Sequence, residues 1–233
     1  MIDWHSHILP GVDDGSRNVE ESVSILGMLN LQGVKTVIAT PHFLANDESV
    51  ESFLKRREKA YDELKKHLPE KSPEILLGAE VKYYNGISKM ADLQKLRIEN
   101  SKLLLLEMPM SKWTEYTVRE LTELSCKGNI KIVLAHIERY MNFQKQSVWE
   151  RLFESGLLMQ VNASYFTSFM TKRKAISLLQ NGMVHFVGSD CHNTTSRAPK
   201  IDKAYDVIKK KFGDEYIEQM NEYGYSLFEK SII

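Results

Sequence analysis

Short apolar runs alternate with longer amphipathic stretches along the chain. The runs are apolar at consecutive positions, which is typical of parallel strands covered on both faces, because both sides of each strand are then buried. Seven such runs are Ile2 to His5, Thr36 to Ala39, Ile75 to Leu77, Leu103 to Leu106, Ile132 to Ala135, Leu157 to Val161, and Phe186 to Val187 with Gly188. The pattern therefore predicts seven buried strands.

The amphipathic stretches between these runs predict helices. In the first stretch Val23, Leu26 and Leu29 recur near helical spacing, and Gly33 follows as a C-cap. The predicted helices are Glu20 to Gln32, Ser49 to His67, Thr114 to Lys127, Val148 to Ser155, Thr171 to Gln180, Lys200 to Phe212 and Asp214 to Tyr223. Strands with interleaved helices favour a closed or nearly closed β/α barrel in a single domain, residues 1–233. An open doubly wound sheet is the alternative, because periodicity alone does not separate the two.

The composition limits the cellular compartments and the binding partners that are expected for this protein. Lys plus Arg (31) balance Asp plus Glu (31), so no overall field directs the protein to nucleic acid or to an anionic membrane. Two cysteines, Cys126 and Cys191, are too few for a disulfide framework and fit a reducing compartment. No apolar run approaches the roughly 20 residues of a membrane span, and no secretory signal pattern opens the sequence. We expect a cytoplasmic protein that neither inserts into the membrane nor binds nucleic acid.

Metal-ligand residue types fall at the ends of six of the seven runs. The carboxyl ends of barrel strands converge on one rim, so these side chains are expected to meet there. They are His5, His7, His42, Glu80, Glu107, His136, Asp190 and His192, and Asp13-Asp14-Gly15 in the loop after the first run can add a further carboxylate. Imidazole and carboxylate together suit divalent Zn, Mn or Fe, and carboxylates can bridge two ions.

This combination of ligands indicates a particular chemistry. Two or three clustered ions activate water near neutral pH and stabilise the attacking and leaving oxygens of an in-line displacement at phosphorus. Arg139 and Arg197 follow His136 and His192 on the rim loops and are suited to bidentate binding of a phosphoryl group. The sequence therefore predicts a metal-dependent phosphoesterase.

Other candidate residues have simpler explanations. His67 is expected to be solvated and His185 to be structural, whereas Asp3 either orients a ligand histidine or occupies a strand edge. Cys191 and Arg197 have the Cys-x5-Arg spacing of cysteine-based phosphatases. That interpretation is disfavoured, because no glycine lies between them and the cysteine stands between two predicted metal ligands.

The chain opens with His5-Ser6-His7-Ile8-Leu9-Pro10-Gly11-Val12-Asp13-Asp14-Gly15, which resembles the opening motif of the bacterial capsule-type tyrosine phosphatases of the polymerase and histidinol phosphatase (PHP) superfamily. Further similar segments are Ala39-Thr40-Pro41-His42, Gly78-Ala79-Glu80, Ala135-His136 with Glu138-Arg139-Tyr140, Val161-Asn162-Ala163-Ser164, and Ser189-Asp190-Cys191-His192-Asn193. The resemblance covers essentially the whole chain. One departure is Ile137, where the family usually has proline; it removes no ligand.

The resemblance implies a distorted TIM-like (β/α)7 barrel of PHP type that holds two or three divalent ions. By motif position one ion takes His5, His7, Glu80 and Asp190, a second shares Glu80 and takes Glu107 and His136, and a third takes Asp14, His42 and His192. Arg139 and Arg197 match family arginines that bind the substrate phosphate.

The resemblance also implies a substrate and a partner. Family members dephosphorylate tyrosines on the tail of a bacterial tyrosine kinase that controls capsule or exopolysaccharide assembly. We therefore expect hydrolysis of phosphotyrosine by ion-activated water, with recruitment to the membrane only through the kinase.

Two alternatives stay open: a small-molecule phosphatase of the same superfamily, such as one acting on histidinol phosphate, and a non-catalytic member that binds metal or kinase. The apparently complete ligand set argues against the second. The opening motif and the compact length favour phosphotyrosine over the first. The neutral charge balance argues against a nuclease.

Overall fold

The strands of the computed structural model, which describes residues 1–228, are all parallel to their neighbours in the sheets. They are β1 (Ile2–Ser6), β2 (Thr36–Ala39), β3 (His42–Phe43), β4 (Glu74–Leu77), β5 (Glu80–Lys82), β6 (Leu103–Glu107), β7 (Lys131–Leu134), β8 (Leu158–Asn162) and β9 (Phe186–Gly188). All seven predicted strands are confirmed. The short β3 and β5 were not predicted.

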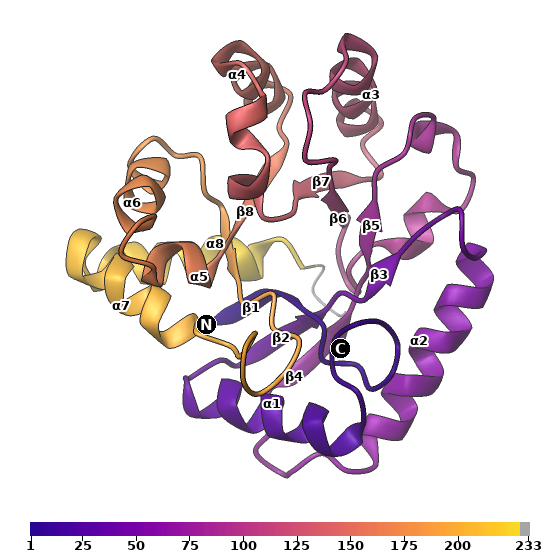
Figure 1. Cartoon of the computed structure of the whole chain (residues 1–233), viewed down its shortest axis with the longest axis vertical. Helices are drawn as coiled ribbons and strands as arrows, with labels where there is room; N and C mark the ends of the chain where they lie inside the picture. The colour runs from indigo at the N-terminus through magenta and orange to yellow at the C-terminus, as the bar shows by residue number, and fades with distance from the viewer. Residues whose placement is uncertain (229–233) are drawn as a thin grey trace.

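These strands form two sheets with the orders β1-β2-β4 and β3-β5-β6-β7-β8-β9. Proline has no N–H to donate, and Pro41 stands between β2 and β3, so the ladder is interrupted there. At the other end of the curl, β1 meets β9 through a bridge between Ser6 and Cys191. The backbone N–H of Asp190 also donates to the carbonyl of His5 at 2.8 Å. The result is one α/β domain built on a curled parallel sheet (Figure 1).

Helices surround the strands (Figure 1). They are α1 (Val19–Leu31), α2 (Val50–Lys65), α3 (Glu115–Cys126), α4 (Gln146–Glu154), α5 (Ala163–Thr167), α6 (Lys172–Gln180), α7 (Ile201–Phe212) and α8 (Asp214–Ser226), with short 3-10 helices η1 (Ile87–Lys89), η2 (Leu93–Leu96), η3 (Ile137–Arg139) and η4 (Met141–Phe143). The seven predicted helices are present with ends shifted by up to three residues. The one-turn α5 and the short 3-10 helices were not predicted; α5 follows β8 without an intervening loop.

The alternation of side chains along β6 explains why the runs are apolar at every position. Leu104 and Leu106 belong to the large cluster of buried side chains that includes residues of the surrounding helices. Leu103 and Leu105 belong to a second cluster, inside the curled sheet. Both faces of the strand are therefore buried, as the continuous pattern predicts.

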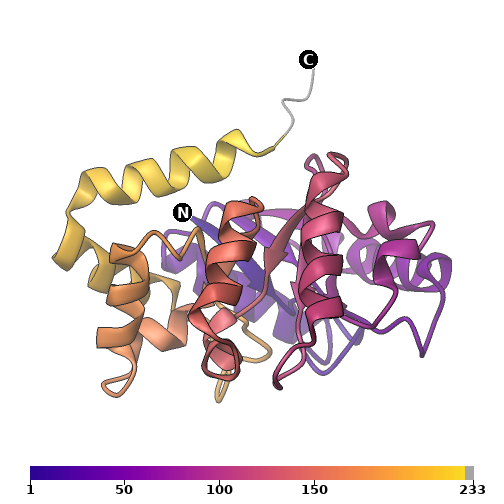
Figure 2. The ribbon, with the colours of Figure 1, turned by 90° about the horizontal axis from the view of Figure 1, so that it is seen from above.

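The helix α8 crosses one face of the molecule, and loops that follow the strands extend from the opposite face (Figure 2). Below α8, the indole of Trp4 stacks on Phe186 with ring centroids 3.9 Å apart. Within residues 1–228 no helix has the length and apolar character needed to cross a membrane.

Candidate metal centre

Each predicted ligand lies at the carboxyl end of one of the seven predicted strands or in the segment that follows. His42 and Glu80 are the first residues of the short β3 and β5, just after β2 and β4. Their imidazole nitrogens and carboxylate oxygens form four overlapping groups in which the ligand atoms lie within 4.8 Å of one another. The groups are His7 with Asp14, His42 and His192; His5 with His7 and Asp190; His5 with Glu80 and His136; and His42 with Glu80 and Glu107. All nine predicted ligands, from four strands and the segments that follow β1, β7 and β9, are thus brought together.

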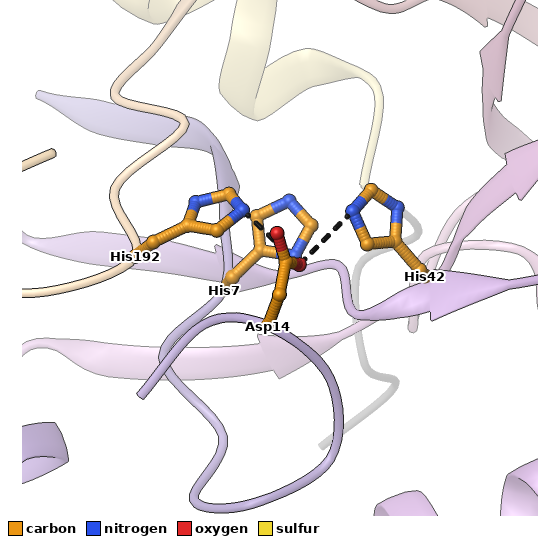
Figure 3. Close-up of side chains that lie close together, drawn as sticks. All are labelled: His7, Asp14, His42 and His192. Atoms are coloured by element: carbon orange, nitrogen blue, oxygen red, sulfur yellow. Dashed lines mark ion pairs between the residues drawn. The ribbon is translucent and has the colours of Figure 1, made fainter. Parts of the chain in front are cut away.

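The first group joins the opening loop to two distant segments of the chain (Figure 3). Asp14 Oδ1 lies 3.3 Å from His42 Nε2 and 3.4 Å from His192 Nε2. The ring of His7 lies behind them, with its centroid 4.0 Å from that of His192. Asp14 is the exposed member of the group, so this part of the site faces solvent.

Glu80 lies at the centre of the other groups. Its Oε2 lies 3.3 Å from His5 Nε2, 3.4 Å from His7 Nε2 and 2.9 Å from His42 Nδ1. Its Oε1 lies 2.7 Å from His136 Nε2. Burial acts against ionisation, yet the charge of His5 and hydrogen bonds from His136 and His42 hold the pKa of Glu80 well below its usual range. This buried carboxylate is therefore ionised, as a metal ligand must be.

Two observations test whether these residues fit metal ions. His5 Nε2 and His7 Nε2 face each other at 3.1 Å, and both approach the carboxylates of Glu80 and Asp190. Among residues 1–228, the buried Nε2 of His192 has no hydrogen-bond partner, although it points at Asp14. Converging ring nitrogens with surrounding carboxylates are the donor set that Zn, Mn and Fe accept. The residues therefore fit divalent ions.

The protonation of the histidines supports the same conclusion. Burial lowers the pKa of His192 to about 4, helped by the positive charges of His7 and Arg197, so this ring is neutral and has a free lone pair. Burial also opposes protonation of His7, but hydrogen bonds to Asp13 and Glu80 raise its pKa to about 10. A divalent ion would replace such protons as the positive charge between imidazole and carboxylate.

Partners behind the ligands fix the orientation of the rings. Asp13 Oδ2 lies 2.7 Å from His7 Nδ1 and accepts from the backbone N–H of His42 at 3.0 Å. Gln160 Oε1 lies 3.2 Å from His5 Nδ1 and accepts from the backbone N–H of His136 at 2.7 Å. The sequence indicated Asp13 only as an alternative ligand beside Asp14, and it missed Gln160, whose only signal was a polar residue inside an apolar strand.

Of the two roles considered for Asp3, the structure does not support the orienting of a ligand histidine ring. Its Oδ1 accepts from the backbone N–H of Ser189 at 2.7 Å and from that of His5 at 3.4 Å. The carboxylate therefore ties β1 to the end of β9, whereas Gln160 and not Asp3 contacts the ring of His5. His185 is structural, as predicted, since its Nδ1 accepts from the backbone N–H of Met159.

Two of the ligands have unusual backbone conformations. His136 has φ 31° and Asp190 has φ 51°, in the left-handed region that residues other than glycine rarely adopt. Such strain persists where the surroundings over-determine it, and it clusters at functional sites. The backbone N–H groups of both residues are held, by Gln160 and by the carbonyl of His5 respectively.

Arg139 and Arg197 both reach Asp190 from opposite loops. Arg197 Nη2 lies 2.8 Å from Asp190 Oδ1, and Arg139 Nη2 bonds to Asp190 Oδ2. Both arginine side chains keep more than a third of their surface exposed. They are therefore anchored beside the ligands and still accessible to an anion from solvent.

Cys191 lacks the surroundings of a nucleophilic cysteine. Its side chain is completely buried in the core, and burial raises the pKa of the thiol far above its ordinary value. Arg197 is hydrogen-bonded to Asp190. The Cys-x5-Arg spacing does not build a phosphate-binding thiolate loop here.

Comparisons with known proteins agree with this geometry. The family described as "Capsular polysaccharide synthesis, CpsB/CapC" matches residues 1–223. The tyrosine-protein phosphatase YwqE of Bacillus subtilis (strain 168) is 32% identical over 222 residues, 92% of this chain and 86% of that protein. The tyrosine-protein phosphatase CpsB of Streptococcus pneumoniae is 33% identical over 237 residues, 94% of each chain.

A solved structure is similar over the full length. It comes from work on YwqE from Bacillus subtilis and CpsB from Streptococcus pneumoniae, described as unique metal-dependent tyrosine phosphatases. It matches with a TM-score of 0.85 and 27% identity, covering 100% of this chain and 96% of that one.

Proposed function

Because this chain belongs to the CpsB/CapC family of capsular polysaccharide synthesis, we propose that it is a metal-dependent protein-tyrosine phosphatase. The observation that carries the proposal is the convergence of nine histidine and carboxylate ligands beside two anchored arginines. Such a site suits hydrolysis of a phosphate ester, and the relatives named tyrosine-protein phosphatases indicate which ester.

The geometry supports a division of the ligands among three ions. The first would take His5, His7, Glu80 and Asp190, the second Glu80, Glu107 and His136, and the third Asp14, His42 and His192. Glu80 is the shared ligand, since its two oxygens approach different histidines. Manganese, iron and zinc all accept this mixture of imidazole and carboxylate.

When bound, these ions would supply Lewis-acid charge and lower the pKa of water for attack at phosphorus. The arginines act on the substrate. Arg139 and Arg197 approach from two loops, so together they can hold the non-bridging oxygens of the phosphoryl group and offset the charge that develops there. The phenol of tyrosine, with a pKa of about 10, leaves far more readily than an alkoxide, so the need for a general acid is small.

We propose that the two sheets are parts of one distorted TIM-like (β/α)7 barrel of PHP type and that residues 1–233 are a single domain. Only two residues separate β2 from β3 and β4 from β5, so each pair acts as one strand bent at the rim. The contact of Ser6 with Cys191 supports closure between β1 and β9.

The proposed substrate is phosphotyrosine on the tail of a bacterial tyrosine kinase in a capsule or exopolysaccharide pathway. The relatives' capsule-synthesis family and their tyrosine-phosphatase names support this assignment. We place the reaction in the cytoplasm, since Cys126 and Cys191 are both unpaired, as is usual in a reducing compartment. Contact with the membrane would come through the kinase.

A comparison of substrates tests the proposal. The Mn²⁺-supplied protein is given a phosphotyrosyl peptide, the matching phosphoseryl peptide and histidinol phosphate, and kcat/KM is measured for each. We expect the phosphotyrosyl peptide to exceed the others by on the order of a hundredfold, because only its leaving group is a phenolate. Faster turnover of histidinol phosphate would instead assign the protein to the small-molecule phosphatases.

A further inference from the structure

The loop between α5 and α6 exposes two large apolar side chains. Phe169 is 98% exposed and Met170 is 86% exposed, the highest fractions among the exposed large hydrophobic side chains of residues 1–228 apart from Leu31. The loop is nevertheless held in place, because Thr171 Oγ1 donates to the carbonyl of Tyr165 at 2.7 Å and the N–H of Lys172 donates to that of Ser168 at 2.9 Å. An ordered loop thus presents two apolar side chains to solvent.

The first turn of α6, directly after this loop, carries three positively charged side chains. Lys172, Arg173 and Lys174 are all exposed, and within the described residues none of them forms an ion pair. Positive charge is unfavourable at a helix N-terminus, where the macrodipole is itself positive. The first turn of α6 contains no acidic residue to offset it. The chain as a whole has no net charge, so this concentration is local.

This patch, defined as Phe169, Met170 and Lys172 to Lys174, lies on the face of the molecule that carries the site. The helix α5 starts directly after Asn162, whose side-chain N–H donates to Asp190 at 2.8 Å. One helical turn and about two extended residues separate Asn162 from Phe169, roughly 15 Å along the chain. In Figure 2 the loop between α5 and α6 extends away from α8, on the side of the strand ends.

We propose that the patch binds the polypeptide on one side of the phosphotyrosine, and that it favours substrates with acidic residues about four or five positions away. This inference rests on the proposed phosphatase function. The positively charged side chains of the patch, which form no ion pair within the described residues, can bind acidic side chains of the substrate. Phe169 and Met170 can pack against an aliphatic or aromatic side chain of the same peptide. An extended chain advances about 3.3 Å per residue, so this spacing reaches the patch from the site.

A crossed set of substrates and variants tests the proposal. One peptide carries glutamates three to six residues on both sides of the phosphotyrosine, a second has glutamines in their place, and p-nitrophenyl phosphate reports the site alone. The protein variants are the triple Lys172→Gln, Arg173→Gln, Lys174→Gln and the double Phe169→Ser, Met170→Ser. We expect the wild type to prefer the acidic peptide about tenfold in kcat/KM, mainly through KM, and the triple variant to lose that preference. The double variant should raise KM for both peptides.

Three comparisons separate this effect from others. Lys209→Gln, Lys210→Gln, Lys211→Gln removes the same charge at the end of α7 and should leave the preference for the acidic peptide unchanged, since that helix ends away from the strand ends. The triple variant should unfold at the same temperature as the wild type or higher, because removing positive charge relieves the opposition to the α6 dipole. The double variant should unfold at the wild-type temperature, because both of its side chains are exposed. Turnover of p-nitrophenyl phosphate should be the same in every variant.

The outcomes are distinct. If the triple variant keeps the wild-type preference for the acidic peptide, the patch proposal is wrong while the phosphatase assignment stands. If the wild type hydrolyses neither the peptides nor p-nitrophenyl phosphate, the proposed function itself fails. If the patch variants lose binding to vesicles containing phosphatidylglycerol, or change from dimer to monomer, with unchanged peptide kinetics, the surface serves a membrane or a second copy and the proposal is overturned.

Discussion

Glu80 illustrates how one residue determines the state of several others. It is 1% exposed and contacts His5, His7, His42 and His136. A buried carboxylate is costly unless it is paired, so Glu80 both requires these rings and holds them near one another. Its position at the start of β5, next to Pro41 and β3, makes this contact set possible.

Gln160 is predicted to set the metal affinity without binding an ion. In Gln160→Met, the volume is nearly kept, but the acceptor for His5 Nδ1 and for the N–H of His136 is lost. We expect the dissociation constant of the metal to rise on the order of 10- to 100-fold, the usual effect of removing a partner of a metal ligand.

Competition with a chromophoric chelator measures that constant directly. The matched control is Gln180→Met at the exposed end of α6, which should leave affinity unchanged. Equal affinity in Gln160→Met and wild type would show that the amide has no such role.

Cys191 is predicted to be dispensable for catalysis. In Cys191→Ala, a completely buried thiol that stays protonated is replaced by a methyl group. We expect kcat for p-nitrophenyl phosphate to stay within about twofold and the free energy of unfolding to fall by about 1 kcal/mol from the small cavity. A loss of turnover beyond tenfold at full metal occupancy would restore the cysteine mechanism.

The convergence of the nine candidate ligands could be predicted from the sequence because their residue types are rare and each follows a recognisable strand. Gln160 could not be, because a single amide in an apolar run gives no sign of its partners. The role of Asp3 could not be predicted either, because its carboxylate binds a backbone N–H that lies just after β9. Only the contact between β1 and β9 brings that N–H within reach.

At the level of elements, the close approach of β9 to β1 leaves no room for a side chain at Gly188. A Cβ there would lie 2.6 Å from His5 Cβ and 3.0 Å from the backbone N of His5. We expect Gly188→Ala to lower the free energy of unfolding by about 1–3 kcal/mol and to weaken metal binding, because β1 and its histidines must shift.

Gly27→Ala provides the control for chemical denaturation. No atom lies within 4 Å of a Cβ at this position in α1, so the substitution should stabilise the protein by roughly 0.5–1 kcal/mol. If Gly188→Ala were as stable as wild type, β1 and β9 would be less tightly apposed than described.

His185, at the entry to β9, makes stability depend on pH. Burial and the charge of Lys131 lower its pKa to about 4 from 6.5. As the pH falls, His185 is therefore protonated in the unfolded chain before it is protonated in the folded protein. The contribution of neutral His185 to the free energy of unfolding is fully present above pH 6.5 and is lost as the pH falls toward 4. The loss is at most about 3 kcal/mol.

His185→Asn keeps a side-chain acceptor for the N–H of Met159 but does not titrate. Its free energy of unfolding should fall less than that of wild type between pH 7 and pH 4.5, as measured by urea denaturation. The same decrease in both proteins would mean that His185 is not responsible. Loss of metal affects both proteins alike, so the difference isolates this residue.

The sequence predicted which strands and long helices are present, but not where a strand is interrupted. The apolar runs located seven strands, but the break between β2 and β3 depends on how the chain bends around Pro41 toward Glu80. The helix α5 has five residues, too few for a helical period to stand out.

At the level of the whole molecule, the two ends of the curled sheet have different roles. One end is covered by α8, where a Cβ on Gly224 would lie 2.8 Å from Trp4 Cζ2. The other end carries the ligands, the arginines and the patch on α6. The packing under α8 and the candidate site thus lie at opposite ends of the strands.

In the proposed function, the nine converging side chains hold the ions on which turnover depends. The most direct test measures metal content and release of phosphate from a phosphotyrosyl peptide on the same sample, before chelation, after it, and during stepwise return of Mn²⁺, Fe²⁺ or Zn²⁺. We predict loss of turnover with loss of metal and recovery that is complete at two or three ions per chain. If the protein kept its full turnover with less than about 0.1 metal ion per chain, turnover would not depend on bound metal.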